Sequence, residues 1–183
     1  IDVIRQAQSA SELLKNPAYR ELLDKSMGAL AGPSKAPLAV IGHARLVTNG
    51  LQGIDANNQP VVKGGVVCVH NGIIVNEPDL WASEPGIVKT SEVDTEVVAA
   101  MVDRDIAAGG SVEDAARDVY RRIYGETSLA LLFRGGRQML LTTNTGSIFY
   151  VVNTRLKAMF FCSELVVANK ALRRMGASWQ EFS

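Results

Sequence analysis

In two stretches of this chain, an apolar run is followed directly by polar side chains that are suited to binding or catalysis. In the first, residues 37–41 are predicted to form a buried strand, and Arg45 follows where that strand ends. A partly desolvated guanidinium at this place presents a planar fork that matches a carboxylate. The alternative is an arginine that is simply solvated at the end of a strand.

The second stretch places an asparagine next to a glycine. Residues 66–69 are predicted to form a strand, and Asn71-Gly72 is a strong signal for a tight hairpin turn. Against a hairpin, residues 73–75 do not alternate cleanly with the preceding strand, and residues 76–78 have the pattern of a helix start. The Asn71 amide and the Gly72 backbone N–H are also a pair of donors suited to a developing oxyanion.

Three motifs, taken in order, resemble those of one enzyme family. They are Gly42-His43-Ala44-Arg45-Leu46-Val47-Thr48, His70-Asn71-Gly72-Ile73-Ile74 and Glu92-Val93-Asp94-Thr95-Glu96. Their order and spelling resemble the glutamine-hydrolysing domain of class II amidotransferases, and within it most closely the glucosamine-6-phosphate synthases. The resemblance covers residues 41–173, and the residues before it match only loosely.

The resemblance implies removal of ammonia from the side-chain amide of L-glutamine through a thioester on an N-terminal cysteine, with no cofactor and no metal. It implies that Arg45 and Thr48 bind the α-carboxylate of glutamine and that Asp94 binds the α-ammonium group. Asn71 and the Gly72 N–H would form the oxyanion hole. When the motif is ignored, Asp94 is equally well explained as the N-cap of the helix that follows it.

The chain departs from the family pattern in two places. Leu46 and Asn49 stand where the synthases carry tryptophan and histidine, so closure of that loop over glutamine is expected to differ. Position 1 is isoleucine, which cannot be the N-terminal nucleophile. Either the chain is a fragment that lacks its first strands, or it is a non-catalytic relative that keeps the pocket as a glutamine-binding or protein-interaction module. We expect the fragment, because the pocket residues are complete.

The two cysteines lie in apolar, strand-like runs. Cys68 and Cys162 are therefore expected to be reduced and structural. Cys68 and His70 would share one face of a strand, so a Cys–His nucleophile pair is an alternative, although a cysteine in a buried strand is usually inert.

The composition fits one soluble globular domain over residues 1–183, with 47% hydrophobic and 21% charged residues. The 19 basic and 19 acidic residues cancel, which gives no electrostatic footprint for nucleic acid or an anionic membrane. We expect a cytoplasmic protein, with L-glutamine as ligand and an ammonia-accepting synthase domain or subunit as partner. The motif spelling favours a sugar phosphate as acceptor, and a homodimer is one option for the assembly.

The hydrophobic pattern predicts an α+β protein. Helices are predicted to begin at Ser9, Asn16, Pro78, residues 91–94, Ser111 and Ser163. The first two are expected to pack over a sheet, and Gly64-Gly65 to form a hairpin or bulge. Four β-rich runs over residues 128–162 are predicted to form one antiparallel meander. The fold that the resemblance implies is the four-layer αββα sandwich of N-terminal-nucleophile hydrolases, lacking its first strand or strands.

Overall fold

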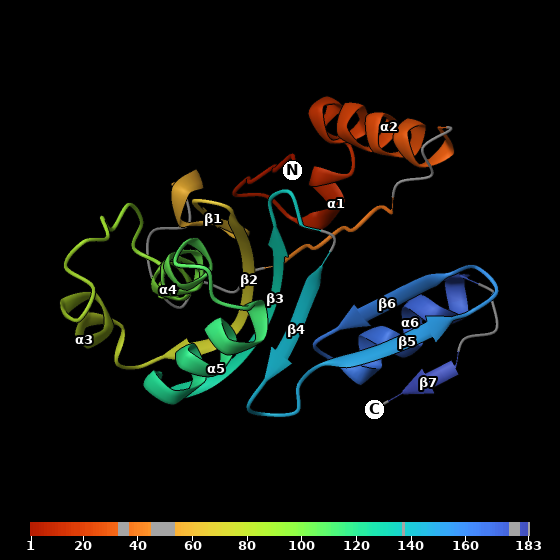
Figure 1. Ribbon diagram of the computed structural model, residues 1–183. Coiled ribbons are helices and arrows are strands. Elements are labelled where there is room, and N and C mark those ends of the chain that lie inside the picture. Colours follow the sequence, from red (N-terminus) through yellow and green to blue (C-terminus); the bar gives the residue numbers. More distant parts are fainter. Residues whose placement is uncertain (33–36, 45–53, 137, 176–179, 183) are drawn as a thin grey trace.

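The computed structural model describes residues 1–32, 37–44, 54–136, 138–175 and 180–182. In these residues the strands form two separate antiparallel sheets (Figure 1). The first sheet has the order β1-β2-β3-β4 and consists of β1 Val61–Lys63, β2 Val66–Ile74, β3 Gly125–Phe133 and β4 Met139–Thr143. The second sheet has the order β6-β5-β7 and consists of β5 Phe149–Asn153, β6 Ala158–Cys162 and β7 Gln180–Phe182.

The single meander predicted over residues 128–162 is wrong, because its four strands are divided between the two sheets. The division falls just after β4, at Asn144. The Asn144 Oδ1 accepts a hydrogen bond from the Thr127 N–H at 2.8 Å, and its Nδ2 donates to the Gly125 carbonyl at 2.9 Å. These two bonds hold the end of β4 against the start of β3, and the chain then leaves the first sheet.

Helices cover one face of each sheet, as the sandwich prediction requires. Helices α4 Thr95–Ala107 and α5 Val112–Arg122 lie against the first sheet, and α6 Leu165–Met175 lies against the second (Figure 1). Between α4, α5 and the first sheet is a core whose largest members include Val66, Met101, Val119, Leu129 and Leu131. The other face of that sheet is also buried at Val67, Val69 and Ala130. The expected α+β fold with layered sheets and helices is therefore confirmed.

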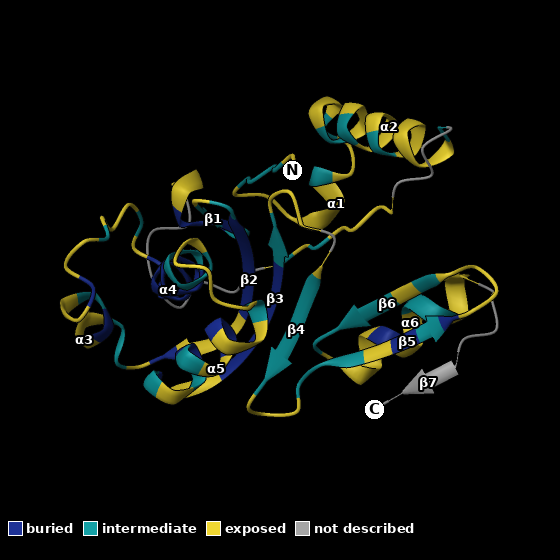
Figure 2. Cartoon of the chain, viewed as in Figure 1, coloured by how far each residue is buried: buried dark blue, intermediate teal, exposed yellow. Residues whose placement is uncertain are grey.

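The N-terminal region forms the predicted helices but not the predicted packing. Helices α1 Ala10–Leu13 and α2 Pro17–Ala31 begin at Ser9 and Asn16, whose side chains accept from the backbone N–H groups of Glu12 and Ala18. However, α2 has no buried residue and covers no sheet (Figure 2). The expected buried strand over residues 37–41 is also wrong, since this segment pairs with no described strand and its Val40 side chain is 72% exposed.

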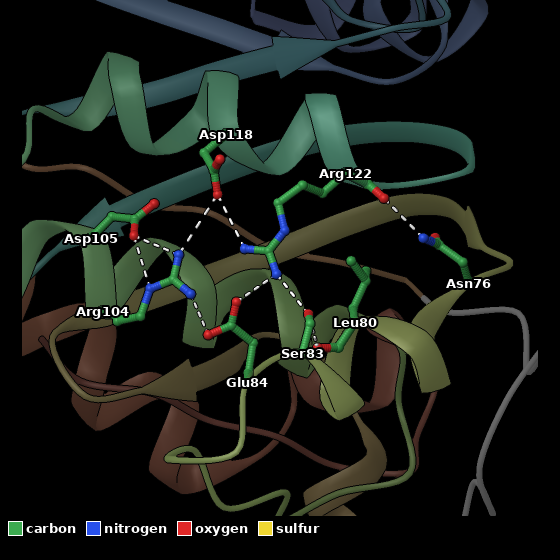
Figure 3. A network of polar contacts seen from close by, with 8 residues as sticks. All are labelled: Asn76, Leu80, Ser83, Glu84, Arg104, Asp105, Asp118 and Arg122. Atoms are coloured by element: carbon green, nitrogen blue, oxygen red, sulfur yellow. Dashed lines mark hydrogen bonds and ion pairs between the residues drawn. The ribbon is translucent and has the colours of Figure 1, made fainter.

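A buried carboxylate connects the helices α3, α4 and α5. Glu84, 5% exposed, follows α3 Glu77–Ala82 and forms ion pairs with Arg104 on α4 and Arg122 on α5 (Figure 3). Arg122 binds it at 2.6 Å, and both arginines also approach Asp118. Burial raises the pKa of Glu84, but hydrogen bonds from the two arginines outweigh it and hold the pKa below its usual range. The network fixes α4 relative to α3 and α5. Among the described residues, no helix is long and apolar enough to span a membrane.

Candidate functional site

The Asn71-Gly72 pair lies inside a strand and not in a turn. Strand β2 runs through both residues to Ile74 in unbroken register with β3, and it places Asn71 opposite Ser128 and Gly72 opposite Thr127. The hairpin alternative is therefore wrong. Gly72 has a φ of +140°, and a Cβ at this position would lie 1.9 Å from the carbonyl oxygen of Glu126. Glycine is thus required for β2 to pair closely with β3 here.

Among the residues that the structure describes, no strand pairs with the other edge of β2 at Gly72. The predicted hairpin at Gly64-Gly65 joins β1 to β2, but β1 pairs with β2 only as far as Cys68. Further along, the Gln59 side chain binds the N–H and C=O of His70, at 2.6 and 2.9 Å. Because antiparallel strands direct the N–H groups of alternate residues to the same edge, the Gly72 N–H points to this edge as well.

Asp94 reaches the same edge from the start of α4. Its Oδ2 accepts a hydrogen bond from the Ile74 N–H at 2.8 Å, and its Oδ1 lies 3.7 Å from His70 Nδ1. Asp94 is the N-cap residue of α4, as the alternative reading expects, but its side chain makes no capping hydrogen bond. Burial raises the pKa of Asp94, but the contacts with His70 and Ile74 outweigh it and lower the pKa. Its side chain, 10% exposed, is therefore ionised at neutral pH.

The last residue of the third motif, Glu96, anchors the loop that leads to Asp94. Its side chain is 1% exposed and accepts hydrogen bonds from the backbone N–H and the hydroxyl groups of Thr90 and Ser91. It also pairs with Lys63 Nζ at 2.6 Å. Burial raises the pKa of Glu96, but these bonds outweigh burial and lower the pKa to about 2. Sequence reasoning assigned no role to Glu96, although the residue stands in the third motif; the signal that could have found it is an acidic residue among the apolar residues of the α4 pattern.

The alternative nucleophile Cys68 is disfavoured by its surroundings. Its side chain is fully buried, and burial, together with the charge of Asp94, raises the pKa of the thiol far above its usual range. His70 shares its face of β2, but the His70 Nδ1 lies 3.2 Å from the Thr95 hydroxyl. A neutral, enclosed thiol is not a nucleophile, so Cys68 acts as a core residue.

Three of the five predicted site residues lie at one end of β2: Asn71, whose side chain is exposed, Gly72, and Asp94, which is bonded to the Ile74 N–H. Arg45 and Thr48 lie outside the described residues. A groove of about 400 Å³ between α5 and β4, lined in part by Arg117, Tyr120 and Leu140, shares no residue with this site. In the described part of the chain, no group of three or more histidine, cysteine or acidic side chains is arranged to hold a metal ion.

Known proteins that are similar to this chain belong to the family that the three motifs resemble. A family model described as a glutamine amidotransferase domain matches residues 43–170. Among curated proteins, the glutamine–fructose-6-phosphate aminotransferase of Caulobacter vibrioides is 35% identical over 137 residues, which cover 74% of this chain and 22% of that protein. The enzyme of the same name from Mesorhizobium japonicum is 36% identical over 108 residues, which cover 58% of this chain and 18% of that protein. The chain thus spans about a fifth of the length of these relatives.

Solved structures confirm the fold. The glutamine phosphoribosylpyrophosphate amidotransferase of B. subtilis, complexed with ADP and GMP, superposes with a TM-score of 0.58 at 20% identity, over 77% of this chain and 30% of that one. A structure described as the allosteric regulatory enzyme of purine biosynthesis gives a TM-score of 0.54 at 19% identity, over 69% of this chain and 27% of that one. With a family model that matches most of its residues and a fold shared with N-terminal-nucleophile amidotransferases, this chain belongs to the glutamine amidotransferase domain family.

Proposed function

We propose that this chain is the glutamine-hydrolysing domain of an amidotransferase and that it binds L-glutamine along the edge of β2 to which the Gly72 N–H points. The observation that carries the proposal is the placement of Asp94 and Gly72 on that edge. Asp94 accepts a hydrogen bond from the Ile74 N–H, and Ile74 lies two residues after Gly72 on β2. Two strand residues place these two N–H groups about 7 Å apart. An amino acid lying along this edge would meet a carboxylate at one end and a hydrogen-bond donor at the other.

Each group has a defined role in this arrangement. The ionised Asp94 binds the α-ammonium group of glutamine, and Arg45 with Thr48 binds its α-carboxylate. The side-chain amide of glutamine then lies near Asn71 and the Gly72 N–H. When a nucleophile attacks the amide carbon, these two donors stabilise the negative charge that develops on the oxygen. Loss of ammonia leaves an acyl-enzyme, which water hydrolyses to glutamate through a second oxyanion at the same donors.

We infer an N-terminal cysteine as nucleophile, since Cys68 is enclosed and its pKa is raised. The names of the relatives favour a sugar phosphate as the ammonia acceptor, and their greater length favours a synthase domain in the same polypeptide as the partner.

Glutamine binding to the purified chain tests the proposal. Isothermal titration calorimetry should show one site for L-glutamine and none for D-glutamine. Asp94→Asn should weaken binding by roughly 10-fold or more, because it removes the charge that pairs with the ammonium group. Asp103→Asn is the matched control: Asp103 also accepts from a backbone N–H of the first sheet, that of Gly65 at 2.7 Å, but at the far end of β2.

Two outcomes would contradict the proposal. One is the absence of L-glutamine binding at any concentration that leaves the chain folded, and the other is equal weakening by Asp94→Asn and Asp103→Asn. Glutamate release by the complete protein then separates a glutaminase from a relative that only binds glutamine. Binding without release would support the non-catalytic alternative.

A further inference from the structure

Two side-chain amides on one short segment make matching contacts on either side of the proposed glutamine site. Gln59 binds the His70 backbone, with its Oε1 accepting from the N–H at 2.6 Å and its Nε2 donating to the carbonyl at 2.9 Å. Asn57 binds Glu92 in the same reciprocal manner, accepting from its backbone N–H and donating to its carboxylate, both at 2.9 Å. His70 and Glu92 each stand two residues before a proposed site residue, Gly72 and Asp94 respectively.

The segment that carries the two amides is itself well held. It begins with the 3-10 helix η1 Asp55–Asn57, in which the Asn57 N–H donates to the Ile54 carbonyl at 2.9 Å. The Asn58 N–H then donates to the Asp55 carbonyl at 3.1 Å. Asn57 and Asn58 are 2% and 6% exposed. We call residues 57–59 the bracket. Because this compact segment binds both Glu92 and His70, it fixes the distance between these two residues.

We propose that the bracket sets the separation between Asp94 and the Gly72 N–H, and that Asn57 and Gln59 are positioning residues that select an amino acid of glutamine length. The inference rests on the proposed function, since it assigns Asp94 to the α-ammonium and Gly72 to the side-chain amide. L-Asparagine carries the same groups on a side chain shorter by one methylene. In a rigid site, L-asparagine is too short to reach Asp94 and the Gly72 N–H at the same time. In a loosened site, these two groups can move closer together and bind it.

The bracket holds β2 at a place where strand pairing does not. Strand β1 stops pairing at Cys68, and no other strand of the described segments pairs with this edge of β2 beyond it. Gln59 and Asp94 take the place of such a strand on either side of Gly72. Without Gln59, Asp94 would be the remaining hold on this edge among the described side chains. Its bond to the Ile74 N–H would persist, but the Gly72 N–H could then shift relative to Asp94.

A matched control exists in Asn76. Its side chain also makes a reciprocal pair of backbone bonds, to the Arg122 carbonyl at 2.8 Å and the Tyr124 N–H at 2.7 Å. This pair joins the start of α3 to the end of α5 and does not connect Asp94 to Gly72. Asn76→Ala therefore removes the same chemistry, at a similar cost in stability, without touching the bracket.

The test compares the affinities of the chain for L-glutamine and L-asparagine. Gln59→Ala and Asn57→Ala should lower the ratio of the two affinities by roughly 10-fold, the scale on which binding sites discriminate one methylene. Asn76→Ala should leave the ratio unchanged although it lowers the melting temperature. Gln59→Glu keeps the shape of Gln59 but turns its donor toward His70 into an acceptor, and it serves if the alanine variants do not fold.

Amide hydrogen exchange without ligand gives a second readout. Gln59→Ala should accelerate exchange at the His70 and Ile74 N–H groups together, whereas Asn76→Ala should not. If the wild-type chain binds glutamine but the bracket variants keep its affinity ratio, or if exchange at Ile74 is unaffected, the bracket is only a structural loop. If the wild-type chain binds neither amino acid, the proposed function fails and this inference fails with it.

Discussion

The contact set around Glu96 predicts a large and pH-dependent loss of stability on the change Glu96→Gln. This substitution keeps the shape of the side chain and removes its charge. It leaves the Lys63 ammonium, whose side chain is 17% exposed, facing a neutral amide. In the wild type, the carboxylate accepts hydrogen bonds from the N–H and O–H groups of Thr90 and Ser91. In the variant, the NH₂ group of the new amide faces some of these donors and cannot accept from them. Removal of one partner of such a pair costs far more than the pair is worth at the surface.

The magnitude follows from the pKa. Folding lowers the pKa of Glu96 from 4.5 to about 2, and a tenfold change in an acidity constant is worth about 1.4 kcal/mol. The charged form therefore contributes about 3 kcal/mol to the free energy of unfolding. Since the folded pKa is below the unfolded one, the unfolded state takes up the proton first on acidification. The contribution is complete above the ordinary pKa of 4.5 and is lost as the pH falls toward 2.

Urea unfolding, followed by circular dichroism over a series of pH values, measures this difference. The variant should unfold with about 3 kcal/mol less free energy near neutral pH, and the two curves should converge on acidification. Glu12→Gln is the control, because Glu12 is 55% exposed and pairs with an exposed Lys15, so its loss should cost less than about 1 kcal/mol. A gap between wild type and Glu96→Gln that is below about 1 kcal/mol, or that stays constant with pH, would refute the reasoning.

Three further changes test other contacts. Gly72→Ala should destabilise the chain by about 2 kcal/mol or more in urea unfolding and weaken glutamine binding, because its Cβ would overlap the carbonyl oxygen of Glu126; an unchanged midpoint would contradict this. Glu84→Gln should lower the free energy of unfolding by about 1 to 3 kcal/mol near neutral pH, and the loss should shrink on acidification, because the pKa of Glu84 is depressed in the folded state. In the complete protein, Asn71→Ala should reduce kcat for glutamate release by roughly 100- to 1000-fold with a much smaller change in KM, and an unchanged kcat would remove Asn71 from the oxyanion hole.

Local signals in the sequence were sufficient for the helices. Ser9, Asn16 and Ser111 each cap the helix that was predicted to follow them. Helix α4 begins close to its predicted start and presents its apolar residues to the first sheet. Capping bonds and helical periodicity involve residues a few positions apart, so they can be read from a short window.

Contacts between distant residues could not be read in this way. The packing of α2 was predicted from its apolar positions, but Leu23 and Met27 remain 44% and 50% exposed. Asn71-Gly72 has the dipeptide preferred in hairpin turns, yet nine consecutive residues of β3 pair with β2 and keep the dipeptide extended. Long-range pairing overrode a local preference, as is common for strands.

The candidate site was partly visible in the sequence, and its supporting contacts were not. The motifs brought Asn71, Gly72 and Asp94 into one proposal, and the structure places them at one end of β2. The reading of Asp94 as a helix cap came from its position alone. Only the three-dimensional contacts show that its carboxylate makes no capping bond and binds the Ile74 N–H.

The position of Gln59 could be predicted from the sequence, but the hydrogen bonds of its side chain could not. Once a turn at Gly64-Gly65 is assumed, the register pairs Val61 with Cys68 and, continued by two residues, sets Gln59 opposite His70. The neighbourhood of these two residues was therefore open to prediction. The structure adds that the Gln59 side chain, and not its backbone, makes both bonds to His70. Because a side chain replaces the strand there, the regular ladder ends before Gly72. In the part of the chain that the structure describes, no strand takes its place, and the proposed ligand would lie there.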